Sequence, residues 1–183
     1  MGGSPTSSAK PTANAERDSA TSRASESTVQ GRAGCWWNMV LAGEVALPAG
    51  EVREPFVDAD DIAAVAAAAL TEPGHEGQLY EVTGPRLLTF ADAVEEISSA
   101  TGREIRYVQL APDAFTDALR AEAVPDGYVW LLDYLFATVL DGRNQYVTDG
   151  VARALGREPR DFGDYARAAA ATGVWAPGAD RVA

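Results

Sequence analysis

Three side chains in the most apolar helix-like segment of the chain are its strongest candidates for contacting a small molecule. Trp130, Asp133 and Tyr134 fall on the side of that segment opposite its predicted core stripe. Aromatic walls with one polar group are the usual make-up of a small-molecule pocket. Phe56, in a short apolar stretch, is a fourth candidate for substrate binding. The alternative is structural, because aromatic residues at helical or strand spacing more often belong to a core.

Three carboxylates, Asp58, Asp60 and Asp61, stand just before an alanine-rich helical pattern. Hard cations bind grouped carboxylates, so a metal site is one interpretation. We favour helix capping instead, because carboxylates suit the positive end of the helix dipole and need no ion there. The only histidine, His75, lies in a Pro/Gly-rich turn without a nucleophile motif, which predicts a solvated loop residue.

Two patterns that serve hydride transfer are not found in these 183 residues. A nicotinamide dinucleotide needs a glycine-rich turn between a strand and a helix, and the nearest approach, GRAG at 31–34, follows no strand-like segment. A tyrosine with a lysine four residues later could act as a general acid, but the only lysine is Lys10. The sequence therefore assigns no catalytic, cofactor-binding or metal-binding residue to this chain.

The charge balance and the cysteine count exclude several classes of protein. A net charge of −12 disfavours nucleic acids and anionic membranes, which bind clustered Lys and Arg. One cysteine, Cys35, permits no internal disulfide, and a cytoplasmic location fits this. The longest apolar run, residues 129–140, contains Asp133 and is much shorter than the roughly 20 residues that cross a bilayer.

The elements that must position these residues follow from hydrophobic periodicity. We expect residues 1–34 to be a disordered, low-complexity leader, residues 35–176 an ordered lobe, and residues 177–183 a flexible tail. The lobe begins with alternating strands and helices and continues mostly with helices. Predicted strands are 43–50, 55–57, 78–83 and 105–109; predicted helices are 58–70, 89–101, 112–122, 126–141, 149–155 and 161–171. The predicted core stripe of the fourth helix consists of Tyr128, Leu131, Leu132, Leu135, Phe136 and Val139.

Four segments, in this order, resemble the NmrA-like, atypical short-chain dehydrogenase family. They are residues 42–48 (AGEVALP), 54–63 (EPFVDADDIA), 80–85 (YEVTGP) and 147–162 (VTDGVARALGREPRDF). The resemblance runs from about residue 40 to 175. It implies an α/β chain that corresponds to the C-terminal part of a Rossmann-like fold, with few short strands, a helical substrate lobe and no nucleotide-binding half.

The same resemblance implies a function. Intact family members bind NADP or NAD, and some reduce quinones or other small carbonyl compounds, whereas others act as non-catalytic redox-sensing regulators. We expect this chain to contact a small-molecule substrate but to bind no cofactor alone. The surface that faces the Rossmann half in the family would be exposed, which predicts self-association or partner binding. Trp36, Trp37 and Asn38 either open the substrate pocket or belong to the junction where the match begins.

Overall fold

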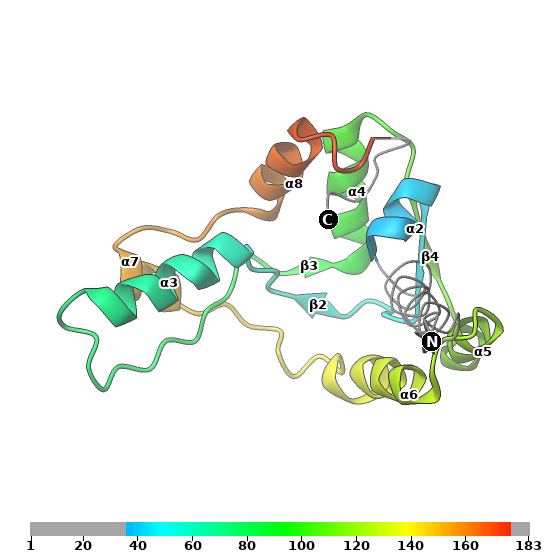
Figure 1. Ribbon diagram of the computed structural model, residues 1–183, viewed down its shortest axis with the longest axis horizontal. Coiled ribbons are helices and arrows are strands. Elements are labelled where there is room, and N and C mark those ends of the chain that lie inside the picture. The colour runs from blue at the N-terminus through cyan, green and yellow to red at the C-terminus, as the bar shows by residue number, and fades with distance from the viewer. Residues whose placement is uncertain (1–35, 177–183) are drawn as a thin grey trace, which may run out of the picture.

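The computed structural model describes residues 36–176, and these form an α/β arrangement of short strands and helices (Figure 1). The predicted leader, Cys35 and the predicted tail lie outside the described residues. The elements in chain order are α2 (Trp36–Ala42), β1 (Glu44–Leu47), β2 (Arg53–Glu54), α3 (Ala59–Thr71), β3 (Leu88–Thr89), α4 (Phe90–Thr101), β4 (Arg106–Gln109), α5 (Pro112–Ala121), α6 (Asp126–Tyr134), the π-helical turn η1 (Leu135–Val139), α7 (Gly150–Leu155) and α8 (Phe162–Ala171).

The core lies around the parallel pair β1–β4, in which Val45 is opposite Tyr107. β1 alternates, so that Val45 and Leu47 are buried. α4 covers this pair and also packs on α8, and its apolar face contributes Phe90, Val94 and Ile97 to the core. A second, antiparallel pair joins β2 to β3 over two residues.

The ends of α4 show why this helix begins and stops where it does. Thr89 and Asp92 form a reciprocal capping box, in which the Thr89 hydroxyl accepts from the Asp92 amide and the Asp92 carboxylate accepts from the Thr89 amide. Gly102 ends the helix in the left-handed conformation that glycine adopts without strain. Both signals are in the sequence, and the predicted helix 89–101 is confirmed.

α3 and α7 pack on each other and form an arm that extends away from α2, α4 and α8 (Figure 1). The Asp58 carboxylate caps α3 by accepting from the Asp60 amide, which confirms the capping interpretation. Asp61 has a different role from the one predicted: it is fully buried and accepts from Arg157 and from the Arg160 amide, each at 2.6 Å. The arm is thereby joined to the loop between α7 and α8.

Two predicted strands are wrong. Residues 55–57 form no strand, although the Pro55 carbonyl accepts from the Gly84 amide at 3.0 Å, and the strand pairing lies just before them at β2. Residues 78–83 form no strand and instead contact the segment before α7 through one backbone and one side-chain atom. The Thr148 hydroxyl donates to the Glu81 carbonyl, and the Thr148 amide donates to the Thr83 hydroxyl. The predicted helices are confirmed within a few residues, except that 126–141 divides into α6 and η1.

The predicted core stripe of α6 is partly wrong. Tyr128 and Leu131 are exposed, whereas Val129 is buried, and Leu132 and Phe136 pack against the core. The helix is therefore rotated relative to the expectation. The reason is tertiary: α6 packs against α5, and this contact selects the face that contains Val129.

Candidate functional site

Trp130 and Asp133 line one hollow, between α5 and α6. This acidic hollow has a volume of about 730 Å³ and is lined by Asp113, Thr116, Asp117, Arg120, Asp126, Val129, Trp130 and Asp133. Tyr134 borders it, since its ring stacks on the Trp130 indole with centroids 5.6 Å apart and 15° between the planes. Arg120 is paired with Asp117 at 3.2 Å, so the remaining aspartates leave an acidic surface. The structure thus brings these three predicted site residues together.

Phe56, the fourth predicted residue, lines a different hollow. This aromatic hollow has a volume of about 460 Å³ and is lined by Trp37, Val40, Phe56, Ile97, Phe162, Tyr165, Val174 and Trp175. The Phe56 and Phe162 rings are 5.5 Å apart, and Phe162 in turn lies 5.6 Å from the Tyr165 ring. Tyr165 contacts Trp175 edge-on at 6.1 Å, which extends the row of aromatic rings. Aromatic side chains from four separate parts of the chain therefore surround one apolar space.

A smaller hollow of about 250 Å³ adjoins the same rings. Phe56, Phe162 and Tyr165 line both hollows, and the smaller one adds Val57, Asp58, Ala59, Arg160 and Asp161. Burial, together with the nearby Asp58 carboxylate, raises the pKa of the Tyr165 phenol above its usual value. The phenol therefore keeps its proton at neutral pH.

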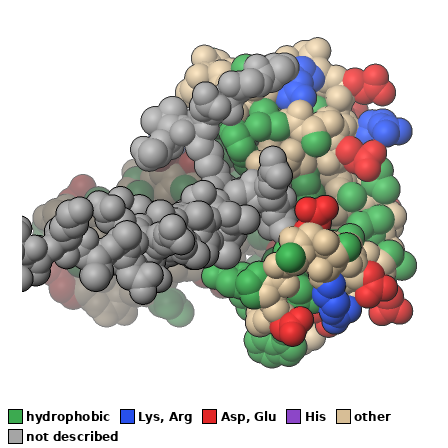
Figure 2. Space-filling model, turned by 45° about the vertical axis from the view of Figure 1, so that its right-hand side comes forward, with side chains coloured by type: hydrophobic (Ala, Val, Ile, Leu, Met, Phe, Trp, Pro, Cys, Tyr) green, Lys and Arg blue, Asp and Glu red, His purple; other side chains and the backbone are tan. Residues whose placement is uncertain are grey.

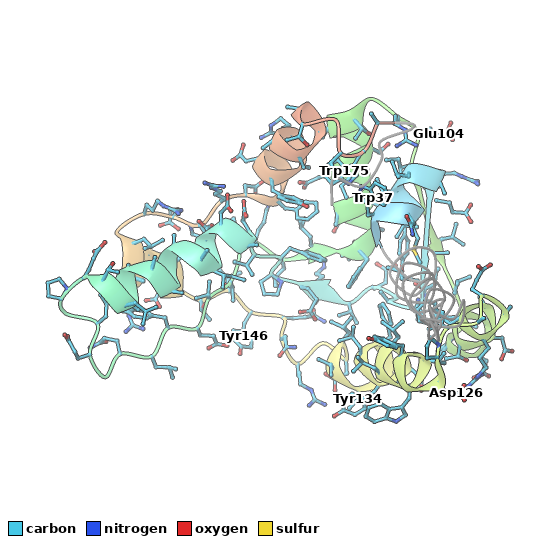
Figure 3. The ribbon with its side chains drawn as sticks, viewed as in Figure 1. Trp37, Glu104, Asp126, Tyr134, Tyr146 and Trp175 are labelled. Carbon is cyan, nitrogen blue, oxygen red and sulfur yellow. The ribbon has the colours of Figure 1, made fainter. Side chains whose placement is uncertain are left out.

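The two main hollows lie at separate ends of the body. Figure 3 shows Trp37 and Trp175 together near the upper end, whereas Tyr134 and Asp126 lie along α6 at the lower end. The Trp37 indole nitrogen donates to the Val174 carbonyl at 2.8 Å, which fixes one wall of the aromatic hollow. Trp37, which the sequence left undecided, therefore lies at a pocket. No predicted site residue joins the two hollows.

Sequence reasoning missed Phe162, Tyr165 and Trp175. Phe162 and Tyr165 stand three residues apart at the start of a helix, which is a signal that they share a face. Nothing in the local pattern shows that this face meets Phe56, which is more than 100 residues earlier. His75 lies in a loop, as predicted, but it is half-buried, and its Nδ1 forms a hydrogen bond of 2.8 Å with the Tyr80 hydroxyl.

The described residues do not fit the pyrophosphate of a nicotinamide dinucleotide. Phosphates bind at helix N-termini that are free of negative charge. Each helix from α3 onward, the turn η1 aside, instead has an aspartate at its N-cap or in its first turn: Asp58, Asp92, Asp113, Asp126, Asp149 and Asp161. A phosphate-binding turn joins a strand to a helix through glycines. β1 is followed by β2 rather than by a helix, and the connection from β4 to α5 contains no glycine, so neither strand of the parallel pair ends in such a turn.

Other site classes are also not met within residues 36–176. No group of three or more His, Cys, Asp and Glu side chains there is arranged to hold a metal ion. None of the helices in this part of the chain is both long and apolar enough to span a membrane. Figure 2 brings the right-hand side of Figure 1 forward and shows more acidic than basic side chains dispersed among apolar ones.

Two solved reductases whose complexes with NADP(H) or NADPH are known share this fold. Triphenylmethane reductase of Citrobacter sp. superposes with a TM-score of 0.63 at 19% identity, over 73% of this chain and 46% of that one. The NADPH-dependent quinone oxidoreductase QOR2 of Escherichia coli gives a TM-score of 0.61 at 23% identity, over 70% and 47%. Complexes of the two with NADP(H) and NADPH, respectively, match this chain similarly. Residues 36–176 therefore have part of the Rossmann-like fold of these enzymes.

Sequence relatives agree with this class. The NAD(P)H azoreductase of Xenophilus azovorans is 39% identical over 129 residues, which are 70% of this chain and 45% of the azoreductase. The oxidoreductase YesF of Bacillus subtilis is 33% identical over 135 residues, or 73% and 47% of the two chains. No family model matches. These likenesses are consistent with the NmrA-like NAD(P)-binding family, and the chain spans about half the length of the curated relatives it matches.

Proposed function

We propose that this chain forms the substrate-side part of an NAD(P)H-dependent oxidoreductase that reduces a small organic molecule, either a quinone or another carbonyl compound. The observation that carries the proposal is the aromatic hollow, which contains Phe56 and has the size and apolar lining of a small-molecule site. The relatives support it, because the azoreductase and the quinone oxidoreductase are both named for the reduction of organic compounds.

The proposal assigns NADP or NAD to a partner region, because the aspartates at the helix N-termini of this chain disfavour a pyrophosphate there. Hydride transfer needs the nicotinamide and the substrate in contact. Phe56 is the predicted site residue that this proposal uses. Trp130, Asp133 and Tyr134 stay a separate prediction for substrate binding, because they surround the acidic hollow instead. A cytoplasmic location belongs to the same proposal, since one cysteine suits a reducing compartment.

A chimera tests the proposal. The region of the Xenophilus azovorans azoreductase that this chain does not match would be joined to residues 36–183, and NADPH oxidation would be followed with a naphthoquinone. We expect turnover by the chimera and none by this chain or by the azoreductase region alone. NADPH consumption by this chain alone would contradict the assignment of the cofactor. A folded chimera that binds NADPH but reduces neither quinones nor carbonyl compounds would overturn the proposed activity.

A second candidate function is a non-catalytic module that associates with another protein, and the arm is the observation that favours it. Ile62 and Leu70 on α3, and Leu79 in the loop after it, are 49%, 85% and 83% exposed. Apolar residues gathered on one surface commonly mark protein contacts. We propose a second copy of this chain as the partner, because α3 packs on α7 and leaves these alanine- and leucine-rich positions uncovered.

Light scattering separates this candidate from a monomer. We expect a dimer in the micromolar range and a monomer for the double variant Leu70→Glu/Leu79→Glu. Leu131→Glu is the matched control, because Leu131 is an exposed leucine on α6, outside the arm. A wild-type monomer, or equal loss of the dimer in the control, would count against self-association through the arm.

A further inference from the structure

We propose that the aromatic hollow binds a flat, uncharged aromatic carbonyl compound without any nucleotide, and that the Tyr165 hydroxyl donates a hydrogen bond to its carbonyl oxygen. This inference rests on the proposed function and deepens it, because it names the ligand class and one residue that orients the ligand. It also separates binding of the ligand from binding of the cofactor.

The lining of the hollow selects a flat apolar body. Val40, Ile97 and Trp175 are 1%, 3% and 6% exposed and provide a buried apolar part of the lining. Phe56, Phe162 and Tyr165 provide ring faces and edges along the side walls. Aromatic side chains prefer offset-stacked or edge-on contacts with other rings, so a flat conjugated molecule has more favourable partners here than a branched aliphatic one.

Charge excludes ionic ligands from this hollow. None of its eight lining residues is charged. The nearest ionic groups belong to the adjoining smaller hollow, and they are already paired: the Arg160 guanidinium lies 3.4 Å from Asp58 and 2.7 Å from Asp60, and Asp161 binds Arg86. An ion moved into the apolar space would lose its hydration without gaining a counter-ion. The volume of about 460 Å³ accommodates a molecule of two fused rings.

Tyr165 supplies the polar contact. Among residues 36–176 its hydroxyl has no hydrogen-bond partner, although its ring forms part of the wall between the aromatic hollow and the smaller hollow. Desolvation and the Asp58 carboxylate raise the pKa of this phenol, so it stays protonated and can donate. A carbonyl oxygen accepts such a bond, whereas an unsubstituted hydrocarbon cannot.

The test compares two ligands that differ only in their carbonyl groups. Binding of 1,4-naphthoquinone and of naphthalene to the full 183-residue chain would be measured by calorimetry without nucleotide, with quenching of tryptophan fluorescence as a second signal. We expect both to bind, and the quinone more tightly. Tyr165→Phe should weaken quinone binding by about 3- to 10-fold and leave naphthalene binding within about twofold, because one net hydrogen bond is lost.

Two further variants show whether an effect on binding comes from the aromatic hollow. Phe162→Ala should weaken both ligands, because it removes a wall of the hollow. Tyr128→Phe is the matched control, since Tyr128 is an exposed tyrosine on α6 that lines neither of the two main hollows, and it should change neither affinity. Circular dichroism would show that each variant is folded.

The inference is overturned if neither ligand binds, or if Tyr165→Phe and Tyr128→Phe affect quinone binding equally. An effect of Tyr165→Phe on both ligands alike would also overturn the hydrogen-bonding role. The outcome is independent of the chimera experiment. If this chain binds quinone but the chimera is inactive, the proposed activity is refuted and the proposed binding site is retained. If the chimera is active but this chain alone binds no quinone, the proposed binding site is refuted and the proposed activity is retained.

Discussion

Replacing Asp61 by asparagine should destabilise the arm strongly, whereas the same change at the adjacent Asp60 should not. Asp61 is fully buried, and its two carboxylate oxygens accept from the Arg157 guanidinium and the Arg160 amide. An asparagine of the same shape offers only one acceptor, so one of these donors would face an amide NH₂ group. Asp60 is 72% exposed and meets Arg160 at the surface, which makes it the matched control.

The expected magnitude follows from the burial of each partner. A hydrogen bond to a charged group contributes about 1.5–3 kcal/mol. Breaking a fully buried ion pair costs more, about 3–5 kcal/mol, but the Arg157 side chain is 43% exposed and regains water when the pair is lost. We therefore expect Asp61→Asn to lower the free energy of unfolding by about 2–3 kcal/mol. This corresponds to a fall in Tm of about 4–12 °C for a chain of this length.

Thermal and urea unfolding followed by circular dichroism would measure the change in both variants. Hydrogen exchange of the α3 amides would show whether the loss is confined to the arm, because α3 has few contacts outside α7 and the Arg157–Arg160 loop. The reasoning would be refuted if Asp61→Asn unfolded within about 0.5 kcal/mol of the wild type, which is the usual scatter of neutral surface changes. It would fail equally if Asp60→Asn had the same effect.

Two other predictions concern the packing and the pH response. Gly84→Ala should destabilise the fold by about 2–3 kcal/mol in urea unfolding, because its Cβ would lie 1.9 Å from the Phe56 carbonyl oxygen. Gly127→Ala in α6 meets nothing within 4 Å and should instead stabilise it by about 0.5–1 kcal/mol; equal effects of the two would contradict the packing argument. The hydrogen bond from Arg86 lowers the pKa of Asp161 from its ordinary 3.8, so the stability that this group contributes is present above that value and is lost as the pH falls through the lowered pKa. Urea midpoints measured from about pH 5 to 2 should therefore fall less steeply for Arg86→Gln than for the wild type, and parallel curves would refute the assignment.

Much of the helical structure was predictable because its signals are local. Asp58 and Thr89 cap their helices as their positions before apolar periodic segments indicate, and Gly102 ends α4 as expected. The strands were less predictable because pairing is not local. Residues 78–83 alternate like a strand, yet within residues 36–176 no strand lies beside them, and their backbone bonds to the segment around Thr148 instead.

The candidate site was only half predictable, for a related reason. Trp130, Asp133 and Tyr134 share one helix, so their spacing alone brings them together. The aromatic hollow joins Trp37, Phe56, Phe162 and Trp175, which are distant in the sequence and meet only when α8 packs on α4. Phe56 was found as a single apolar residue, and nothing local to it indicates its partners.

The aspartates at the helix N-termini stabilise the helices, and they also bear on which region binds the substrate and which binds the cofactor. A carboxylate at the first turn stabilises the helix through the dipole and occupies the position that a phosphate would take. The same residues that hold α3, α4 and α8 in place therefore make the described region a poor site for a dinucleotide. The aromatic hollow, in contrast, has eight lining residues between Trp37 and Trp175 within the described part of the chain. We therefore expect this chain to bind the substrate and the remaining region of its relatives to bind the cofactor. For this chain alone, the affinity for quinone should be the same with and without NADPH.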